Sequence, residues 1–166
     1  MQFSRIDFTA LGEKGAGAAF GPPVSDDLVQ DDTGEWIRTV EREGVALVYV
    51  LDRDRENSRL QMLSFTKTGL SGPRGIQIGQ VLEEVAALFR SDGAAIAMEV
   101  DAETEDVVPL YGDGRLQPYG ALEDQGWRRT LRYVTAYTGA DGASREATLH
   151  LTFEDNLLTE IMIYAW

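Results

Sequence analysis

The second half of this chain repeats the pattern of the first half, and this repetition limits the folds open to it. The segment Glu35–Arg42 (EWIRTVER) returns as Gly126–Tyr133 (GWRRTLRY), with the tryptophan, one arginine and the threonine in the same places. Two further apolar segments recur in the same order: Val45–Asp52 with Glu146–Glu154, and Arg59–Thr66 with Leu157–Tyr164. Because a repeated unit buries its apolar face against its neighbour, we expect both copies to share one core.

A helical segment is expected ahead of the strands in each copy. Leu11–Gly21 loosely matches Ile78–Arg90, although Gly12, Gly15 and Gly17 inside it make it a poor helix. Within Ile76–Phe89 the apolar residues follow helical spacing, which predicts the best helix of the chain. Residues 24–34 are predicted to be a polar connector. We therefore predict an α+β fold, with two tandem helix-plus-antiparallel-strand units forming one curved sheet and the helices packed on one face.

The predicted units differ in length. The first, degenerate unit covers residues 1–68, and residues 69–75 (GLSGPRG) have the composition of a linker. The second unit covers residues 76–166 and carries an insertion at 94–120. Within the insertion we predict a strand at 94–100, an acidic turn at 101–106 and a loop at 111–120. The insertion is long enough to lie over one face of the sheet.

Period-two alternation assigns the two faces of the predicted sheet. Apolar residues that share one face are assigned to the core: Val45, Leu47, Tyr49, Leu51, Leu63, Phe65, Ala147, Leu149, Leu151, Phe153, Ile161 and Ile163. The opposite face mixes apolar and polar side chains, so we take it as the candidate binding surface. Its candidate residues in the second unit are Thr148, His150, Glu160, Met162 and Tyr164.

Trp36 and Trp127 begin the matched strands, and an arginine follows each of them two positions later. Turned inward, the two tryptophans are matched core residues, an interpretation that the large area of an indole favours. Turned outward, a tryptophan beside an arginine has the composition of an interface hot spot. Arg38 and Arg129 therefore join the candidate binding residues.

Composition and charge exclude several classes of protein. Hydrophobic residues make up 43% of the 166 residues, which is typical of a globular domain. The 28 acidic residues outnumber the 15 basic ones and give a formal net charge of −13. This charge argues against nucleic acid or an anionic membrane as the partner, and it allows a basic protein. No apolar run is long enough to predict a membrane span.

The sequence contains no recognisable catalytic or metal-binding arrangement. The absence of cysteine excludes thiolate zinc sites and cysteine nucleophiles. His150 is the single histidine, and no nucleophile motif accompanies it. Residues 52–57 (DRDREN) lack the glycine of an EF-hand calcium loop, and the position of its bidentate glutamate holds Leu63. We therefore predict a protein that is not an enzyme and that uses no cofactor, metal or small-molecule ligand.

Gly75–Phe89 (GIQIGQVLEEVAALF) resembles the Ile-Gly helix opening of β-lactamase-inhibitor-like repeat domains, a fold type also found in small outer-membrane-assembly lipoproteins. Leu149–Tyr164 (LHLTFEDNLLTEIMIY) is similar to the strand, turn and strand that end such a unit. The resemblance covers the second unit, while the first lacks the Ile-Gly start. It implies tandem units whose concave sheet face holds a partner protein, and it transfers no binding residue. A cystatin-like or ligand-pocket α+β fold is the competing interpretation.

We expect a non-enzymatic bacterial domain that binds a protein on one sheet face. The resemblance favours an exported, extracytoplasmic protein. The alternative is a cytoplasmic, acidic immunity- or antitoxin-like protein that neutralises a basic partner through complementary charge. A native start at Met1 would favour that second location.

Overall fold

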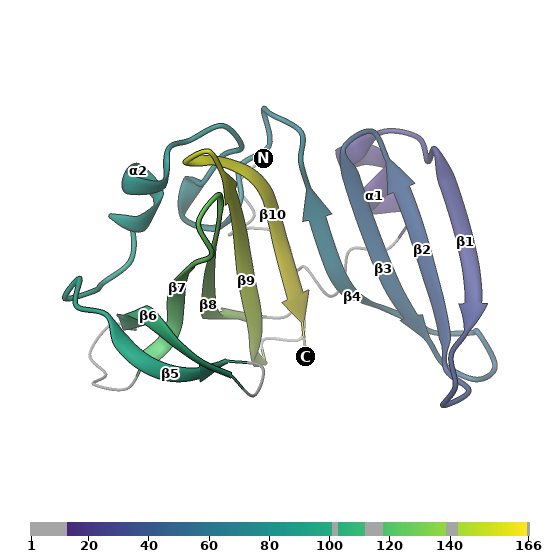
Figure 1. Ribbon diagram of the computed structural model, residues 1–166. Coiled ribbons are helices and arrows are strands. Elements are labelled where there is room, and N and C mark those ends of the chain that lie inside the picture. Colours follow the sequence, from purple (N-terminus) through teal and green to yellow (C-terminus); the bar gives the residue numbers. More distant parts are fainter. Residues whose placement is uncertain (1–12, 101–102, 112–117, 139–142, 166) are drawn as a thin grey trace.

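One antiparallel sheet dominates the computed structural model, which describes residues 13–100, 103–111, 118–138 and 143–165 (Figure 1). The sheet has ten strands, in the order β1-β2-β3-β4-β10-β9-β8-β7-β6-β5. The strands are β1 (Ser25–Gln30), β2 (Trp36–Arg42), β3 (Val45–Leu51), β4 (Ser58–Phe65), β5 (Ile96–Val100), β6 (Glu103–Tyr111), β7 (Pro118–Asp124), β8 (Arg128–Thr138), β9 (Ser144–Glu154) and β10 (Leu157–Ala165). The helical pieces are α1 (Glu13–Phe20), the 3-10 turn η3 (Pro73–Gly75) and α2 (Leu82–Ala86).

The strand order divides the sheet into two meanders. Strands β1 to β4 pair in sequence in the first half, and strands β5 to β10 do so in the second. The halves join where β4 pairs with β10, so the last strand of each half lies at the centre of the sheet (Figure 1). Because β4 and β10 are antiparallel, the two halves are related by an approximate two-fold axis at this seam.

The predicted α+β class is wrong. Helix accounts for 12% of the structure, and only one helix among the described residues reaches seven residues or more. The protein is a mostly β structure built on a single antiparallel sheet, without the predicted layer of helices. The helical pieces still contribute single buried side chains, and Ala16, Leu82 and Val85 belong to the core cluster.

The helix predicted over Ile76–Phe89 shrinks to the five residues of α2. The preceding segment pairs with the start of β10 instead: the Gly79 amide donates to the Leu158 carbonyl at 2.8 Å, and the Leu158 amide donates to the Gln80 carbonyl at 2.9 Å. Gly79 has a φ of 91°, which ends any helical path there. Tertiary hydrogen bonds therefore override the helical spacing of the sequence.

The start of the chain shows the opposite error. The glycine-rich segment forms the longer helix, α1, which ends at Gly21. The φ of 82° at Gly21 and the hydrogen bond from its amide to the Gly17 carbonyl suit a helix C-cap. Part of the predicted connector, Ser25–Gln30, is strand β1 and pairs along its whole length with β2. Backbone pairing with β2 outweighs the acidic composition of this segment.

The described part of the insertion, residues 94–100, 103–111 and 118–120, extends the sheet. Residues 96–100 form a strand as predicted, but the expected acidic turn is wrong, because residues 103–106 belong to β6. Strands β5 and β6 add to the outer edge beyond β7. Most of the loop predicted at 111–120 lies outside the described residues.

The predicted division between the two sheet faces is confirmed. The apolar residues assigned to the core are buried, except for Leu51, which is half-buried and packs against the core cluster. Largest among the fully buried side chains are Phe65 and Phe153, one from each half. The core therefore runs continuously under the seam, as expected for two units that share one interior.

The two halves also match residue by residue in their strand pairing. In the first half Val40 faces Leu47, which faces Leu63; in the second, Leu131 faces Leu151, which faces Ile161. A register irregularity follows at the same place in each half, after Val48 of β3 and next to Glu160 of β10. This pairing moves the β3 and β9 match two residues from the sequence alignment, so that Leu47 corresponds to Leu151 and not to Leu149.

Candidate functional site

The seam between β4 and β10 places the predicted binding residues of the second half beside residues of the first. The paired register runs from Ile161 opposite Phe65 to Tyr164 opposite Met62. Directly opposed residues of neighbouring antiparallel strands point to the same face. Rows of side chains therefore cross the seam on the face opposite the core.

Two such rows, together with a third that runs on the same face from β10 to β7, form one surface, which we call the seam face. The first row holds Val48, Met62, Tyr164 and Thr148; the second holds Ser64, Met162, His150 and Arg132; the third holds Glu160, Thr152, Thr130 and Glu123. All five candidate residues predicted on β9 and β10 are therefore brought together here.

Burial and polarity change across the seam face. Ser64, Thr152 and Glu123 are buried, and the remaining residues are half-buried. Apolar side chains gather around the seam itself, where Met62, Met162 and Tyr164 lie on adjacent strands. Polar side chains follow towards β7 and β8. An apolar centre beside a polar border is the usual anatomy of a protein-binding surface.

An ion pair forms part of that polar border. Arg132 donates to Glu123 through Nη2, which lies 3.3 Å from Oε2, and its Nε lies within ion-pair distance of Oε1, at 3.2 Å. Glu123 is 2% exposed, so its carboxylate depends on the guanidinium to offset lost hydration. This pair was not predicted from the sequence, because a loop was expected at 111–120, where β7 begins.

His150 occupies the middle of the seam face. Its ring meets that of Tyr164 edge to face, with centroids 5.4 Å apart and planes at 71°. Burial lowers the pKa of His150 below its ordinary 6.5, and the positive charge of Arg132 lowers it further. The imidazole is therefore neutral at pH 7, and it suits a partner as an aromatic, hydrogen-bonding group and not as a cation.

The two predicted arginines lie elsewhere, which corrects their assignment to the same face. Arg38 is opposite Tyr49, and Arg129 is opposite Phe153, so both sit on the face that carries the core. Each arginine lines a shallow corner pocket at the end of its half. The predicted binding residues therefore divide between the seam face and two corners.

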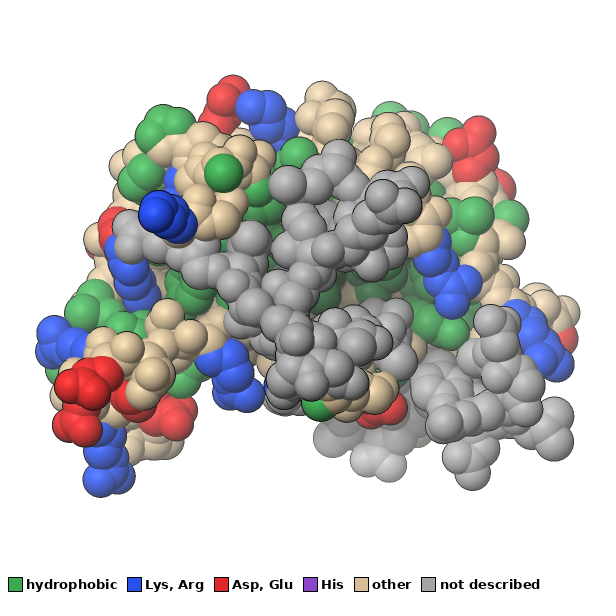
Figure 2. Space-filling view, turned by 180° about the vertical axis from the view of Figure 1, so that it is seen from behind, with side chains coloured by type: hydrophobic (Ala, Val, Ile, Leu, Met, Phe, Trp, Pro, Cys, Tyr) green, Lys and Arg blue, Asp and Glu red, His purple; other side chains and the backbone are tan. Residues whose placement is uncertain are grey.

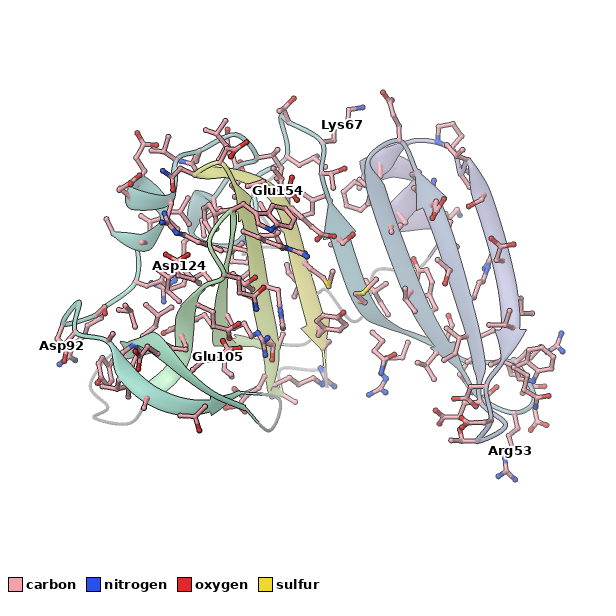
Figure 3. All side chains as sticks on the ribbon, in the orientation of Figure 1. Arg53, Lys67, Asp92, Glu105, Asp124 and Glu154 are labelled. Carbon is pink, nitrogen blue, oxygen red and sulfur yellow. The ribbon has the colours of Figure 1, made fainter. Side chains whose placement is uncertain are left out.

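The corner pockets occupy corresponding places in the two halves. The first corner is lined by Arg38, Tyr49, Leu51, Arg55, Glu56 and Ser58 and has a volume of about 160 Å³. The second corner is lined by Gly126, Trp127, Arg129, Phe153, Asp155 and Asn156 and has a volume of about 340 Å³. The two-fold relation puts them at opposite ends of the strands: in Figure 3 Arg53, near the first corner, is labelled at the bottom, and Glu154, near the second, is labelled towards the top.

An aspartate of the neighbouring strand holds the arginine in each corner. Arg38 donates to both carboxylate oxygens of Asp26, with Nε 2.8 Å from Oδ1. Arg129 donates through Nε to Asp124 Oδ2 at 3.0 Å and through Nη1 to Asn156 Oδ1. The hydrogen bond from Arg38 lowers the pKa of Asp26. The pKa of Asp124 is lowered mainly by the hydrogen bond from the Gly126 amide, and also by the hydrogen bond from Arg129.

The two tryptophans differ in their surroundings. Trp36 is half-buried, and the Arg55 guanidinium carbon lies 3.4 Å from the centroid of its ring. Trp127 is 69% exposed, so the prediction of a matched core residue is wrong for it. The reason lies in the turns: the first half has a six-residue connection at 52–57 that carries Arg55, whereas Asp155 and Asn156 alone connect β9 to β10.

Charged side chains of both signs gather at the first corner. Seen from behind, red and blue side chains lie together where the β1–β2 and β3–β4 turns meet (Figure 2).

No group of His, Asp or Glu side chains among the described residues is arranged to hold a metal ion. Nor does any helix within the described part of the chain have the length and apolar character to cross a membrane.

The fold and the site therefore define a mostly β protein with a two-fold repeated sheet, one mixed face and two corner pockets. Comparison of the chain with protein-family models, with curated proteins and with solved structures gives no match.

Proposed function

We propose that this protein is a non-enzymatic binding domain that holds a protein partner on the seam face. The observation that carries the proposal is the cluster of half-buried apolar side chains at the seam, where Met62, Met162 and Tyr164 lie on two adjacent strands. Methionine and aromatic side chains are enriched at protein interfaces and adapt well to a partner's shape.

The polar residues around this apolar cluster support the proposal. His150, neutral at pH 7, and the Arg132–Glu123 pair offer directed hydrogen bonds beside the apolar centre. Glu123 holds Arg132 in place, so this part of the surface is ordered before a partner arrives. Such preorganisation reduces the entropy lost on binding.

The charge of the chain favours a basic partner. A formal net charge of −13 attracts positive surfaces over a distance set by the salt concentration. This observation also keeps the second candidate function, an acidic immunity- or antitoxin-like protein that neutralises a basic protein. In that case association should slow strongly as salt rises, because long-range charge acts mainly on the association rate.

Affinity capture with matched variants tests the proposal. We expect Met162→Glu to fail to capture the partner that the wild-type protein captures, because the substitution places a carboxylate in the apolar cluster of Met62, Met162 and Tyr164. The control is Val29→Glu, which places the same charge on a 59% exposed valine of the edge strand β1. Both variants should unfold within a few degrees of the wild type.

Direct titration with the purified partner should then give the same order of affinities. Equal binding by Met162→Glu and the wild type would reject the seam face. Loss of binding by both variants would show that added charge alone is responsible, and would also reject it.

A further inference from the structure

Beside the first corner Arg55 covers the ring of Trp36, the strand partner of Leu51, whereas among the described residues no cation covers Trp127 of the second corner. Arg55 covers Trp36 at 3.4 Å, and it comes from the six-residue turn between β3 and β4. Among the described residues the other cation–ring contacts involve Arg74 with Phe89 and Tyr133, and none involves Trp127. The short β9–β10 turn cannot supply an arginine to the second corner.

The charges lining the two corners differ in the same way. In the first corner Arg38 is held by Asp26, while Arg55 and Glu56 contribute one charge of each sign. In the second, Arg129 is held by Asp124, and Asp155 adds a negative charge that no further cation of the lining residues offsets. The lining of the second corner therefore has one positive side chain fewer than the lining of the first.

Space is available for that group. The second corner has a volume of about 340 Å³, against about 160 Å³ for the first. Trp127, which is 69% exposed, and Asp155 both line this space, and the Asp155 amide donates to the Trp127 carbonyl at 3.4 Å, which keeps the two residues adjacent. A planar cation placed there would contact both the ring and the Asp155 carboxylate region.

We infer that the second corner binds the guanidinium group of an arginine side chain presented by another protein. The incoming group takes the place on Trp127 that Arg55 takes on Trp36, so the first corner is an internal copy of the bound state. The site lies on other residues than the seam face and does not depend on it. It accepts a basic peptide of the kind that the net charge of the chain attracts.

The test uses the full ¹⁵N-labelled chain and the capped tripeptide acetyl-Gly-Arg-Gly-amide. The indole Nε1–H signals of the tryptophans are followed by NMR as the peptide is added, with Trp127→Leu assigning the Trp127 signal. We expect a saturable shift of the Trp127 signal and none of the Trp36 signal. The uncharged citrulline peptide should bind about two- to fivefold more weakly, the range of an exposed cation–ring contact.

Arg55→Ala provides the matched control. Removal of the internal arginine opens the ring of Trp36, so in this variant the Trp36 signal should also shift with the arginine peptide. A Trp127 signal that does not shift, or that shifts equally with the citrulline peptide, would overturn the inference whatever Trp36 does. A wild-type Trp36 signal that shifts as much as Trp127 would overturn it too.

The peptide test and the seam-face test can fail separately. Met162→Glu should leave the shift of the Trp127 signal unchanged, because Met162 lies on the other face of the sheet. Loss of the shift in that variant would overturn the assignment of the peptide to the corner. A normal Trp127 response together with equal partner capture by Met162→Glu would reject only the proposed function.

Discussion

Ser64 of β4 lies directly opposite Met162 of β10, and the two residues occupy corresponding positions in the two halves of the chain. On either side of them Leu63 faces Ile163, the counterpart of Phe65. Likewise Phe65 faces Ile161, the counterpart of Leu63. This crossed pairing is what a two-fold axis between Ser64 and Met162 requires. The repeat seen in the sequence is therefore present in the register of the seam.

A designed disulfide can test that register. Ser64→Cys combined with Met162→Cys should form a disulfide on oxidation, because opposed residues of antiparallel strands have Cβ atoms about 4.5–5.5 Å apart. The natural chain has no cysteine to compete. Mass spectrometry with and without reductant measures the bond, and urea unfolding should show a gain of roughly 2–4 kcal/mol.

Ser64→Cys combined with His150→Cys serves as its control. His150 is opposite Met162 on the next strand, so it lies two strand spacings, about 10 Å, from Ser64. This pair should stay reduced. Equal cross-linking of both pairs would contradict the register.

Leu151→Ala should reduce the free energy of unfolding by roughly 2–5 kcal/mol, since Leu151 is fully buried on the core face of β9. His150→Ala, on the neighbouring residue of the same strand, should cost much less, because its side chain lies half-buried on the seam face. Urea unfolding of both variants measures the difference. Similar losses from the two substitutions would mean that the two faces are misassigned.

Two glycine substitutions should have opposite effects. Gly17 lies inside α1, where an added Cβ has no atom within 4 Å, so Gly17→Ala should stabilise the protein by about 0.5–1 kcal/mol. At Gly120 of β7 an added Cβ would lie 1.9 Å from the Arg132 carbonyl oxygen. Gly120→Ala should therefore lower the melting temperature markedly or prevent folding. Thermal unfolding by circular dichroism distinguishes the two, and a tolerated Gly120→Ala would contradict the close approach of β7 and β8.

The lowered pKa of His150 predicts a pH dependence of stability. Because the folded protein binds the His150 proton less tightly than the unfolded chain, stability should fall as pH drops below about 6.5 towards the lowered folded pKa. One proton limits this contribution to about 1.4 kcal/mol per pH unit. His150→Gln should flatten the curve of unfolding free energy against pH between 5 and 7.5, and an unchanged slope would show that other groups produce it.

Local alternation in the sequence was sufficient to predict the strands and their faces. Leu149, Leu151 and Phe153 were assigned to the core from period two alone, and all three are buried. The helices were not predictable in this way, because the length of α2 depends on two hydrogen bonds with Leu158 of β10, one donated by the Gly79 amide and one accepted by the Gln80 carbonyl. A contact with a strand far along the chain leaves no trace in local spacing.

The same limit applies to the candidate site. Thr148, His150, Glu160, Met162 and Tyr164 could be grouped from alternation, whereas Met62 joins them only through the pairing of β4 with β10. Trp127 was misjudged because its exposure depends on the length of a different turn. The matched tryptophans indicate that the corner is repeated. The unequal lengths of the β3–β4 and β9–β10 connections are the sequence feature that could have predicted the different surroundings of Trp36 and Trp127.

The position of the seam also bears on how the protein is made. Every other strand pair of the described sheet joins neighbours in the chain, but the second edge of β4 must wait for β10, which is synthesised after the nine other strands of this sheet. Until then the nascent first half carries an open strand edge on which unpaired backbone groups can recruit another chain. A second copy's β10 fits that edge in the native register, so slow closure should yield strand-exchanged dimers, and crowded expression should increase their share.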